Sequence, residues 1–382
     1  MTFKEFSFFL PGKIHFGVNS SAHMDGYLKE YSIKRVLFIS DRGLEKAGLV
    51  QKMERVLRSA GIVFVTFLDV EANPSIETVE KGIDLFQENQ LDGILCLGGG
   101  SVIDTAKAVS MVVSNGGRIQ DYEGPHKVKA PVIPVIAVPT TAGTGSEVTP
   151  FTVITNRQNS FKFSIFSYET IPRAAILDPE LITTLPPLVA ASTGMDALTH
   201  AIESYISLAS FSFSEAMSEK AMELYALYLR RFVANRMDIE AASGVLLGSM
   251  YAGVAFSWGR LGIVHAMAHP LGGFFDMPHG IANAVMLPTV LEYNALADRG
   301  KYKKILEILR QRPVGSFVSS LLVDEIRQLS KEVGIPENLS SQGVTGESIP
   351  RMAEDAMKSG NIFINPRQVT IEDIEILYRS AL

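Results

Sequence analysis

The chain contains 382 residues, of which 47% are apolar and 20% are charged, and its formal net charge at pH 7 is −6. These values are typical of a folded globular protein with two domains, and they exclude a disordered chain. The acidic balance and the absence of a basic stripe argue against a nucleic-acid partner. A single cysteine, Cys96, excludes an intramolecular disulfide and fits a reducing compartment.

Neither a membrane span nor a signal peptide is predicted. Apolar runs such as "PVIPVIAVP" are interrupted by prolines well short of membrane-spanning length. The first residues, "MTFKEFSFFLPGKIHFG", lack the uninterrupted apolar core and the small-residue cleavage site of a signal peptide. We therefore expect a cytoplasmic protein without membrane contact.

The first half of the chain alternates two kinds of segment. Short, apolar, β-branched segments at 35–40, 63–68, 93–98 and 132–139 are separated by amphipathic stretches, such as 44–61 and 75–90. Strands that are apolar on both faces and alternate with helices predict a parallel sheet covered by helices on both sides. The first half is thus predicted to be a Rossmann-like α/β domain.

The pattern changes after the double proline at 186–187. Long segments with helical apolar spacing follow, including 213–233 and 313–334, and strand patterns are absent from this half of the sequence. We expect an α/β domain over residues 1–185, followed by an all-helical domain over residues 186–382.

The stretch "LCLGGGSVIDTAKAV" (95–109) leads from a predicted strand through three glycines into a predicted helix. Free N–H groups at a helix start bind phosphate, and Ser101 can cap the helix and contact the same group. Gly98 and Gly100 fit the dinucleotide fingerprint G-x-G-x-x-G, but its third position is Ile103. The alternative is a tight turn between strand and helix without a ligand.

A second loop, "PTTAGTGSEVT" (139–149), supplies hydroxyl groups directly after another predicted strand. Two such loops after neighbouring parallel strands would border one crevice at the carboxyl edge of the sheet, where dinucleotides bind. Asp41 follows the strand at 35–40, where its carboxylate can accept a hydrogen bond from a ribose hydroxyl and repel the extra phosphate of NADP. Asp41 is alternatively an ordinary turn or cap residue.

Three of the seven histidines lie within "GIVHAMAHPLGGFFDMPHG" (262–280). Asp196 and His200 are four residues apart, as are His265 and His269, so each pair shares one helix face. His279 lies in a predicted loop or helix start. A carboxylate with several imidazoles suits Fe(II), Zn(II) or Mn(II). Spacing leaves open which histidines are ligands, and buried histidines satisfied by their neighbours are the alternative.

Taken together, the motifs resemble those of the iron-containing (group III, metal-dependent) alcohol dehydrogenase family over essentially the whole chain. They are "FxxPGKIHFG", "GGGSVIDTAK", "PTTAGTGSE", "GMDALTHAIE", "GIVHAMAHPLGGFFDMPHG" and "NPRQVTIEDI". The resemblance implies an oxidoreductase that transfers a hydride between NAD(H) and a small alcohol and its aldehyde or ketone. It also implies a divalent metal, Fe(II) or alternatively Zn(II), and a homodimer or higher homo-oligomer.

The resemblance also assigns residues. It implies Asp196, His200, His265 and His279 as metal ligands, and His269 as a catalytic residue that forms hydrogen bonds or relays a proton beside the metal. The predicted cofactor-binding residues are Asp41, Asn73, Gly98, Gly99, Gly100, Ser101, Asp104, Thr140, Thr141, Thr144, Thr149, Phe151, Lys162 and Leu181. Trp258 and Arg260 depart from the smaller or amide residues expected there, so the substrate preference typical of the family does not transfer directly.

Three other functions remain open at this point. One is an NAD- and metal-dependent lyase of the dehydroquinate synthase type, which would produce no net NADH. The second is a zinc-dependent polyol dehydrogenase of the glycerol type, and the third is a metal- and nucleotide-binding protein without turnover. Small primary alcohols and diols, including ethanol, butanol and propanediols, are all candidate substrates.

Overall fold

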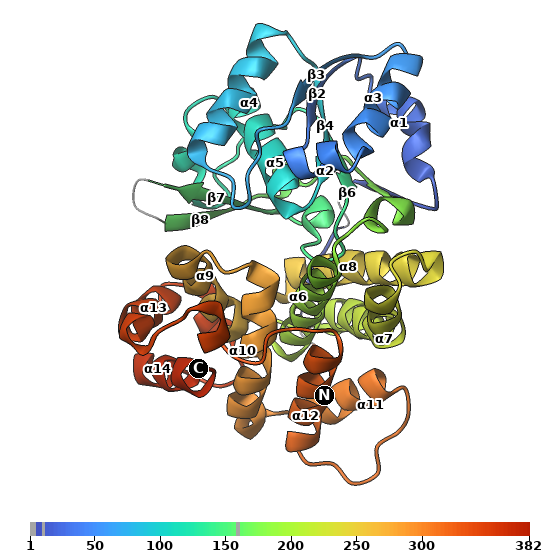
Figure 1. Cartoon of the computed structure of the whole chain (residues 1–382). Helices are drawn as coiled ribbons and strands as arrows, with labels where there is room; N and C mark the ends of the chain where they lie inside the picture. Colours follow the sequence, from blue (N-terminus) through green and yellow to red (C-terminus); the bar gives the residue numbers. More distant parts are fainter. Residues whose placement is uncertain (1–4, 10–11, 158–160) are drawn as a thin grey trace. The chain divides into compact units, whose positions relative to one another are not determined.

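The computed structural model describes residues 5–9, 12–157 and 161–382, which form two compact units (Figure 1). The α/β unit comprises residues 9–141 and 145–184. The helical unit comprises residues 185–382, together with residues 142–144 and the segment that ends at Phe8.

A six-stranded parallel sheet forms the centre of the α/β unit, as predicted. Its strand order is β1-β9-β6-β4-β2-β3. The strands are β1 (Lys13–Phe16), β2 (Arg35–Ile39), β3 (Val63–Phe67), β4 (Gly93–Gly98), β6 (Val135–Pro139) and β9 (Ala174–Leu177). The sequence did not indicate β1 and β9. The segment predicted at 132–139 becomes a strand only at Val135, because Pro134 has no N–H to give to the ladder.

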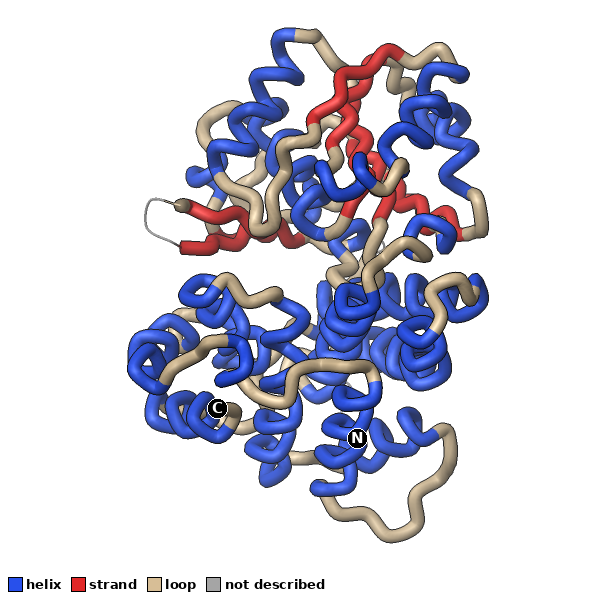
Figure 2. Tube along the Cα trace, in the orientation of Figure 1, coloured by secondary structure: helices blue, strands red, loops and turns tan. Residues whose placement is uncertain are grey.

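Helices cover both faces of this sheet (Figure 2). On one face, α1 (Met24–Glu30) and α3 (Leu49–Ser59) pack on Val36 and Phe38, and on the other, α4 (Ile76–Glu88) and α5 (Gly100–Asn115) pack on Leu37 and Ile39. Alternate residues of β2 thus enter two different hydrophobic clusters, as expected for a strand buried on both faces.

Two details of the α/β unit differ from the prediction. The helix predicted over 44–61 is divided into α2 (Arg42–Lys46) and α3, because Gly48 has a φ of +78° that ends the first helix. A second sheet, not predicted, consists of β5 (Gly124–Pro125), β7 (Phe151–Asn156) and β8 (Phe161–Phe166), with β7 and β8 antiparallel.

The second unit is helical, as predicted. Its helices are α6 (Pro187–Ile206), α7 (Ser212–Ala234), α8 (Ile239–Gly259), α9 (Ile263–Phe275), α10 (His279–Asn294), α11 (Lys301–Arg310), α12 (Ser320–Glu332), α13 (Ile349–Ala356) and α14 (Ile371–Ser380). Pro187 opens α6, where proline is favoured because the first helical N–H needs no partner. Helix α6 packs against α7, α8 and α10, so most of its residues are buried.

Helix α8 corrects one expectation. It has 21 residues and a mean hydropathy of 1.4, so among the described helices it meets the length and composition of a membrane span. The prediction that every apolar run falls short of that length is therefore wrong for α8. Because 72% of its apolar window is buried within the protein, packing against α6 and α7 accounts for its hydropathy.

Candidate active site

Helix α6 carries the first two predicted metal ligands. Asp196 and His200 are one turn apart, and both are buried. The distance from Asp196 Oδ1 to His200 Nε2 is 3.9 Å. Burial lowers the pKa of His200, although the nearby Asp196 carboxylate opposes this shift, so the imidazole is in its neutral, metal-binding form.

Helices α9 and α10 bring two further histidines to Asp196. His265 Nε2 lies 3.8 Å and His279 Nε2 lies 3.9 Å from Asp196 Oδ1. The donor atoms of these three residues all lie within 4.8 Å of one another. Metal–ligand bonds to such donors are about 2.0–2.2 Å long, so small shifts of these side chains would bring all three donors onto one ion. One carboxylate oxygen and two imidazole nitrogens form a donor set suited to Fe(II) or Zn(II).

His200 lies directly beside this group of three. Its ring stacks on that of His265, with the ring centroids 4.5 Å apart, and on Phe256 of α8 at the same distance. The structure thus places all four predicted ligands together. His200 approaches Asp196 as closely as His279 does but stays outside the tightest group of donor atoms.

His269 lies at the accessible end of the cluster. It is exposed, whereas His265, one turn earlier on α9, is buried. Its ring stacks on that of His279 with the centroids 5.4 Å apart and an interplanar angle of 19°. His279 itself keeps 35% of its side chain exposed. His269 and His279 are therefore the members of the cluster that are accessible to solvent.

Asn283 is a member of the cluster that the sequence analysis missed. Its Nδ2 lies 2.6 Å from Asp196 Oδ1, 3.0 Å from His265 Nε2 and 3.1 Å from His279 Nε2. Its Oδ1 is buried and has no partner within the described part of the chain. The available signal was its position one turn after His279, on the same face of α10.

The two glycine-containing loops of the α/β unit lie side by side, as predicted. Thr140 N–H donates a hydrogen bond of 3.1 Å to the Gly98 carbonyl, where β4 and β6 pair. A Cβ at Gly99 would lie 3.3 Å from the Thr141 side chain, so the loops touch without a gap. Gly100 begins α5, and its first N–H groups are available for an anion.

Three of the predicted cofactor residues, Asn73, Ser101 and Lys162, also come together. Asn73 N–H donates to Ser101 Oγ at 3.3 Å, and Lys162 Nζ donates to Asn73 Oδ1 at 3.0 Å. Asn73 has a φ of +56°, a left-handed conformation that asparagine tolerates better than most residues. The loop before α4, the start of α5 and strand β8 therefore meet at Ser101.

A buried lysine, also missed, organises another part of the predicted cofactor set. Lys107 is fully buried, and its Nζ donates hydrogen bonds of 2.9 Å to Ser146 Oγ and to the carbonyls of Thr149 and Phe151. Asp104 accepts from Ser146 Oγ at 2.6 Å, and its second oxygen accepts from the Val153 N–H. Asp104, Thr149 and Phe151 thus surround Lys107.

The remaining predicted cofactor residues have separate positions. Asp41 caps α2, because its Oδ1 accepts a 2.9 Å hydrogen bond from Leu44 N–H at the carboxyl end of β2. Leu181 is buried in the hydrophobic cluster beside α1 and α3. Thr144 belongs to the helical unit. Arg260 follows α8 with a φ of +63° and a ψ of −176°, a conformation otherwise restricted to glycine.

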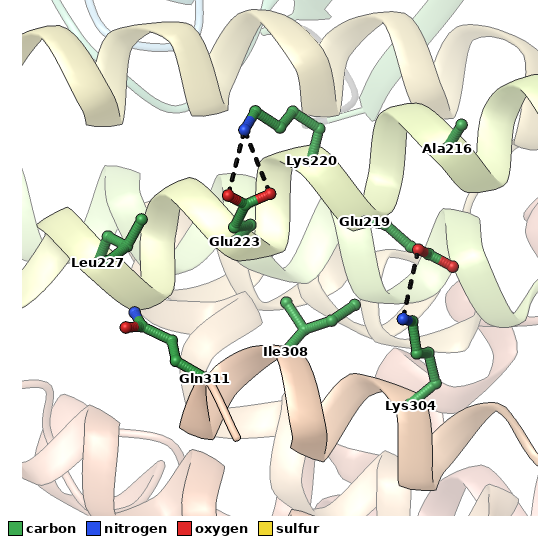
Figure 3. Close-up of a pocket in the computed structure, with 8 residues that line it drawn as sticks. All are labelled: Ala216, Glu219, Lys220, Glu223, Leu227, Lys304, Ile308 and Gln311. Carbon is green, nitrogen blue, oxygen red and sulfur yellow. Dashed lines mark hydrogen bonds and ion pairs between the residues drawn. The ribbon is translucent and has the colours of Figure 1, made fainter. Parts of the chain in front are cut away.

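A surface groove of about 610 Å³ between α7 and α11 lies apart from these sets (Figure 3). An ion pair between Lys304 and Glu219 joins the two helices, and another, between Lys220 and Glu223, lies within α7. None of its lining residues is a predicted metal or cofactor residue.

Comparisons with known proteins identify the family of the chain. Residues 11–179 match the family model "Iron-containing alcohol dehydrogenase", and residues 190–382 match "Fe-containing alcohol dehydrogenase family, C-terminal". The chain is 39% identical to the 1,3-propanediol dehydrogenase of Citrobacter freundii over the full length of both proteins. It is 36% identical to the NAD-dependent methanol dehydrogenase of Bacillus methanolicus, over 98% of this chain and 100% of that protein. A crystal structure of a 1,3-propanediol oxidoreductase superposes with a TM-score of 0.96 at 38% identity, covering 99% of this chain and 100% of the other. The chain therefore belongs to the iron-containing alcohol dehydrogenase family, whose members are oxidoreductases of alcohols and aldehydes.

Proposed function

We propose that this protein oxidises small primary alcohols and diols with NAD⁺ and reduces the corresponding aldehydes. The observation that supports this most is the group of Asp196, His265 and His279 donor atoms, which lie within 4.8 Å of one another. The names of relatives that act on 1,3-propanediol and methanol support the substrate class. We further propose a cytoplasmic homo-oligomer. The matches favour this function over the lyase and glycerol-type alternatives.

Four residues are proposed to hold a divalent metal: Asp196, His200, His265 and His279. When bound, the metal supplies a Lewis acid that favours the alkoxide form of the alcohol. Asp196 contributes the negative charge of the site, and the buried histidines stay neutral because burial lowers the pKa values of His200 and His265.

The dinucleotide is proposed to bind the two loops of the α/β unit. Gly99, Gly100 and Ser101 would hold the pyrophosphate at the start of α5, where main-chain N–H groups and the helix dipole favour an anion. Thr140 and Thr141 would line the adenine or ribose side, and Asp41 would accept a hydrogen bond from the ribose. When bound there, the nicotinamide would supply the acceptor for the hydride that the alcohol loses.

His269 is proposed to carry the proton that leaves the alcohol. Its exposed ring lies on His279, at the accessible end of the cluster. Replacing His269 with alanine should preserve metal binding and slow turnover, with a normal metal content. Loss of the metal in that variant would refute the assignment.

The test is NADH formation by anaerobically purified protein with a panel of small alcohols and diols. The protein is assayed metal-free, then with Fe(II) or Zn(II) restored, and with NADP⁺ in place of NAD⁺. We expect activity that returns with one of the metals and prefers NAD⁺. One bound metal per chain without NADH formation from any alcohol would instead favour the lyase or the non-catalytic alternative.

A further inference from the structure

Glu203 is a buried glutamate on the ligand-bearing face of α6. It follows Asp196 by seven residues and His200 by three, a spacing that places all three side chains on one helix face. The residue is 2% exposed. Burying a carboxylate is costly unless hydrogen bonds or an opposite charge compensate it, so its contacts need an explanation.

Those contacts are all with the beginning of α9. Glu203 Oε1 accepts a 2.7 Å hydrogen bond from Val264 N–H, and Oε2 accepts one of 3.4 Å from His265 N–H. Oε2 also lies 2.6 Å from Nδ1 of the His265 ring. Gly262, the residue before α9, has no side chain to cap the helix, and Glu203 supplies the missing acceptor from α6.

The main chain leaves room for this carboxylate only because residue 262 is glycine. A Cβ at Gly262 would lie 2.7 Å from Glu203 Oε1 and 3.1 Å from Asn365 Oδ1. Gly262 has a φ of −126°, which other residues also adopt, so backbone conformation does not require glycine here. Glycine is required here because the Glu203 carboxylate approaches the main chain so closely.

We propose that Glu203 is the positioning residue of the metal centre. Its carboxylate accepts the Nδ1–H of His265, which fixes the tautomer that leaves the Nε2 lone pair facing Asp196, 3.8 Å away. Carboxylates behind a ligating imidazole orient the ring and increase its basicity. Because Glu203 also holds the first turn of α9, it ties the helix bearing His265 to the helix bearing Asp196 and His200. This inference rests on the proposed metal site.

The principal variant is Glu203→Gln, which keeps the size of the side chain. An amide nitrogen facing His265 would favour the opposite tautomer, with the proton on Nε2, and an amide nitrogen facing Val264 would oppose its N–H. We expect the affinity for Zn²⁺ and Co²⁺ alone, measured by competition with a chelator, to fall by about 10- to 100-fold. We also expect a changed visible absorption spectrum of the Co²⁺-loaded protein, because the geometry around the ion changes.

Glu147→Gln is the matched control. Glu147 is also 2% exposed, and burial raises the pKa of both glutamates to about 7, but the charged side chain that opposes this shift for Glu147 is Lys107. Its Zn²⁺ affinity and Co²⁺ spectrum should match those of the unmodified protein. Gly262→Ala keeps the Glu203 charge and displaces the carboxylate, so it should reproduce the effect of Glu203→Gln.

A cycle with His265→Ala separates positioning from general destabilisation. Without the imidazole, Glu203→Gln should cause little further loss of Zn²⁺ affinity, since the residue it positions is gone. If Glu203→Gln leaves the Zn²⁺ affinity and the Co²⁺ spectrum unchanged, the positioning role is overturned. This holds even if the variant has a lower thermal stability. Failure of the unmodified protein to bind Zn²⁺ or Co²⁺ would instead refute the proposed metal site.

Discussion

Replacing Lys107 with methionine should destabilise the α/β unit more than any surface substitution. Methionine retains most of the aliphatic length of lysine, so the change removes the ammonium group and leaves little empty volume. Three hydrogen bonds of 2.9 Å then disappear, those to Ser146 Oγ and to the Thr149 and Phe151 carbonyls. The carboxylate of Asp104, which also holds Ser146, loses its nearby positive charge.

The size of the effect follows from these contacts. Hydrogen bonds from a charged donor contribute about 1.5–3 kcal/mol each, but removing the ammonium also removes the cost of burying it. Removing one partner from a buried network of charged groups lowers the free energy of unfolding by about 3–5 kcal/mol. Whole domains are stable by about 5–15 kcal/mol, so this substitution should remove a large fraction of the total.

Hydrogen exchange read by mass spectrometry is the suitable assay, because it reports on each unit of a two-unit chain separately. Lys107→Met should accelerate exchange in 100–115 and 146–153 and weaken NAD⁺ binding, since α5 begins at the glycine loop. Lys81→Met, an exposed position on α4, is the control and should leave both unchanged. A loss below about 1 kcal/mol in Lys107→Met, the usual range for surface substitutions, would refute the reasoning.

Three further predictions concern single residues. Burial raises the pKa of Glu147 from 4.5 to about 7, so the folded state holds this proton more tightly than the unfolded state, and the free energy of unfolding falls as the pH rises through that window. Glutamine has no proton to lose. In denaturant titrations, the free energy of unfolding of Glu147→Gln should therefore rise by about 3 kcal/mol relative to that of the unmodified protein between pH 5 and pH 8. A pH-independent difference would contradict this. A Cβ at Gly280 would lie 2.3 Å from the main-chain oxygen of Ser192, so Gly280→Ala should shift His279 and weaken Zn²⁺ binding about tenfold or more, measured by chelator competition. Asp41→Ser keeps a capping oxygen for α2 and removes the charge, so kcat/KM with NADP⁺ should rise about tenfold or more. An unchanged kcat/KM with NADP⁺ would contradict the proposed contact of Asp41 with the ribose.

The alternation of apolar and amphipathic segments was enough to predict the parallel sheet and the helical second unit. Strands β2 and β4 are five and six residues long and buried on both faces, which gives a strong pattern. Strands β1 and β9 are four residues each, too short for a pattern, and pair with each other only after about 160 residues of intervening chain. The small sheet was missed because β7 mixes polar and apolar residues on half-buried positions.

The candidate site was predictable where side chains repeat along one helix. Asp196 with His200, and His265 with His269, share helix faces, and this spacing indicated Asp196 and His265, two of the three residues whose donor atoms the structure brings together. The choice among the histidines came from the family resemblance. Asn283 carries the same spacing relative to His279, but an asparagine in an apolar helix gives no distinctive signal. The role of Lys107 could not be predicted for another reason. Its three hydrogen-bond acceptors at 2.9 Å lie about 40 residues away in the sequence, and two of them are main-chain carbonyls, which no sequence motif encodes.

Glu203 and Lys107 indicate a way to find such residues. Each is a charged side chain buried on a helix that carries predicted site residues. Main-chain groups far away in the sequence hold each of them: N–H groups at the start of α9 bind Glu203, and the carbonyls of Thr149 and Phe151 bind Lys107. An apolar side chain of similar volume would cost less to bury, so stability alone does not account for either charge. Glu203 lies 62 residues from His265 in sequence, yet its position on the face of Asp196 and His200 is visible in the sequence. A charged residue on the ligand face of an otherwise apolar helix should therefore be expected to orient a ligand, and Glu203→Gln tests that expectation directly.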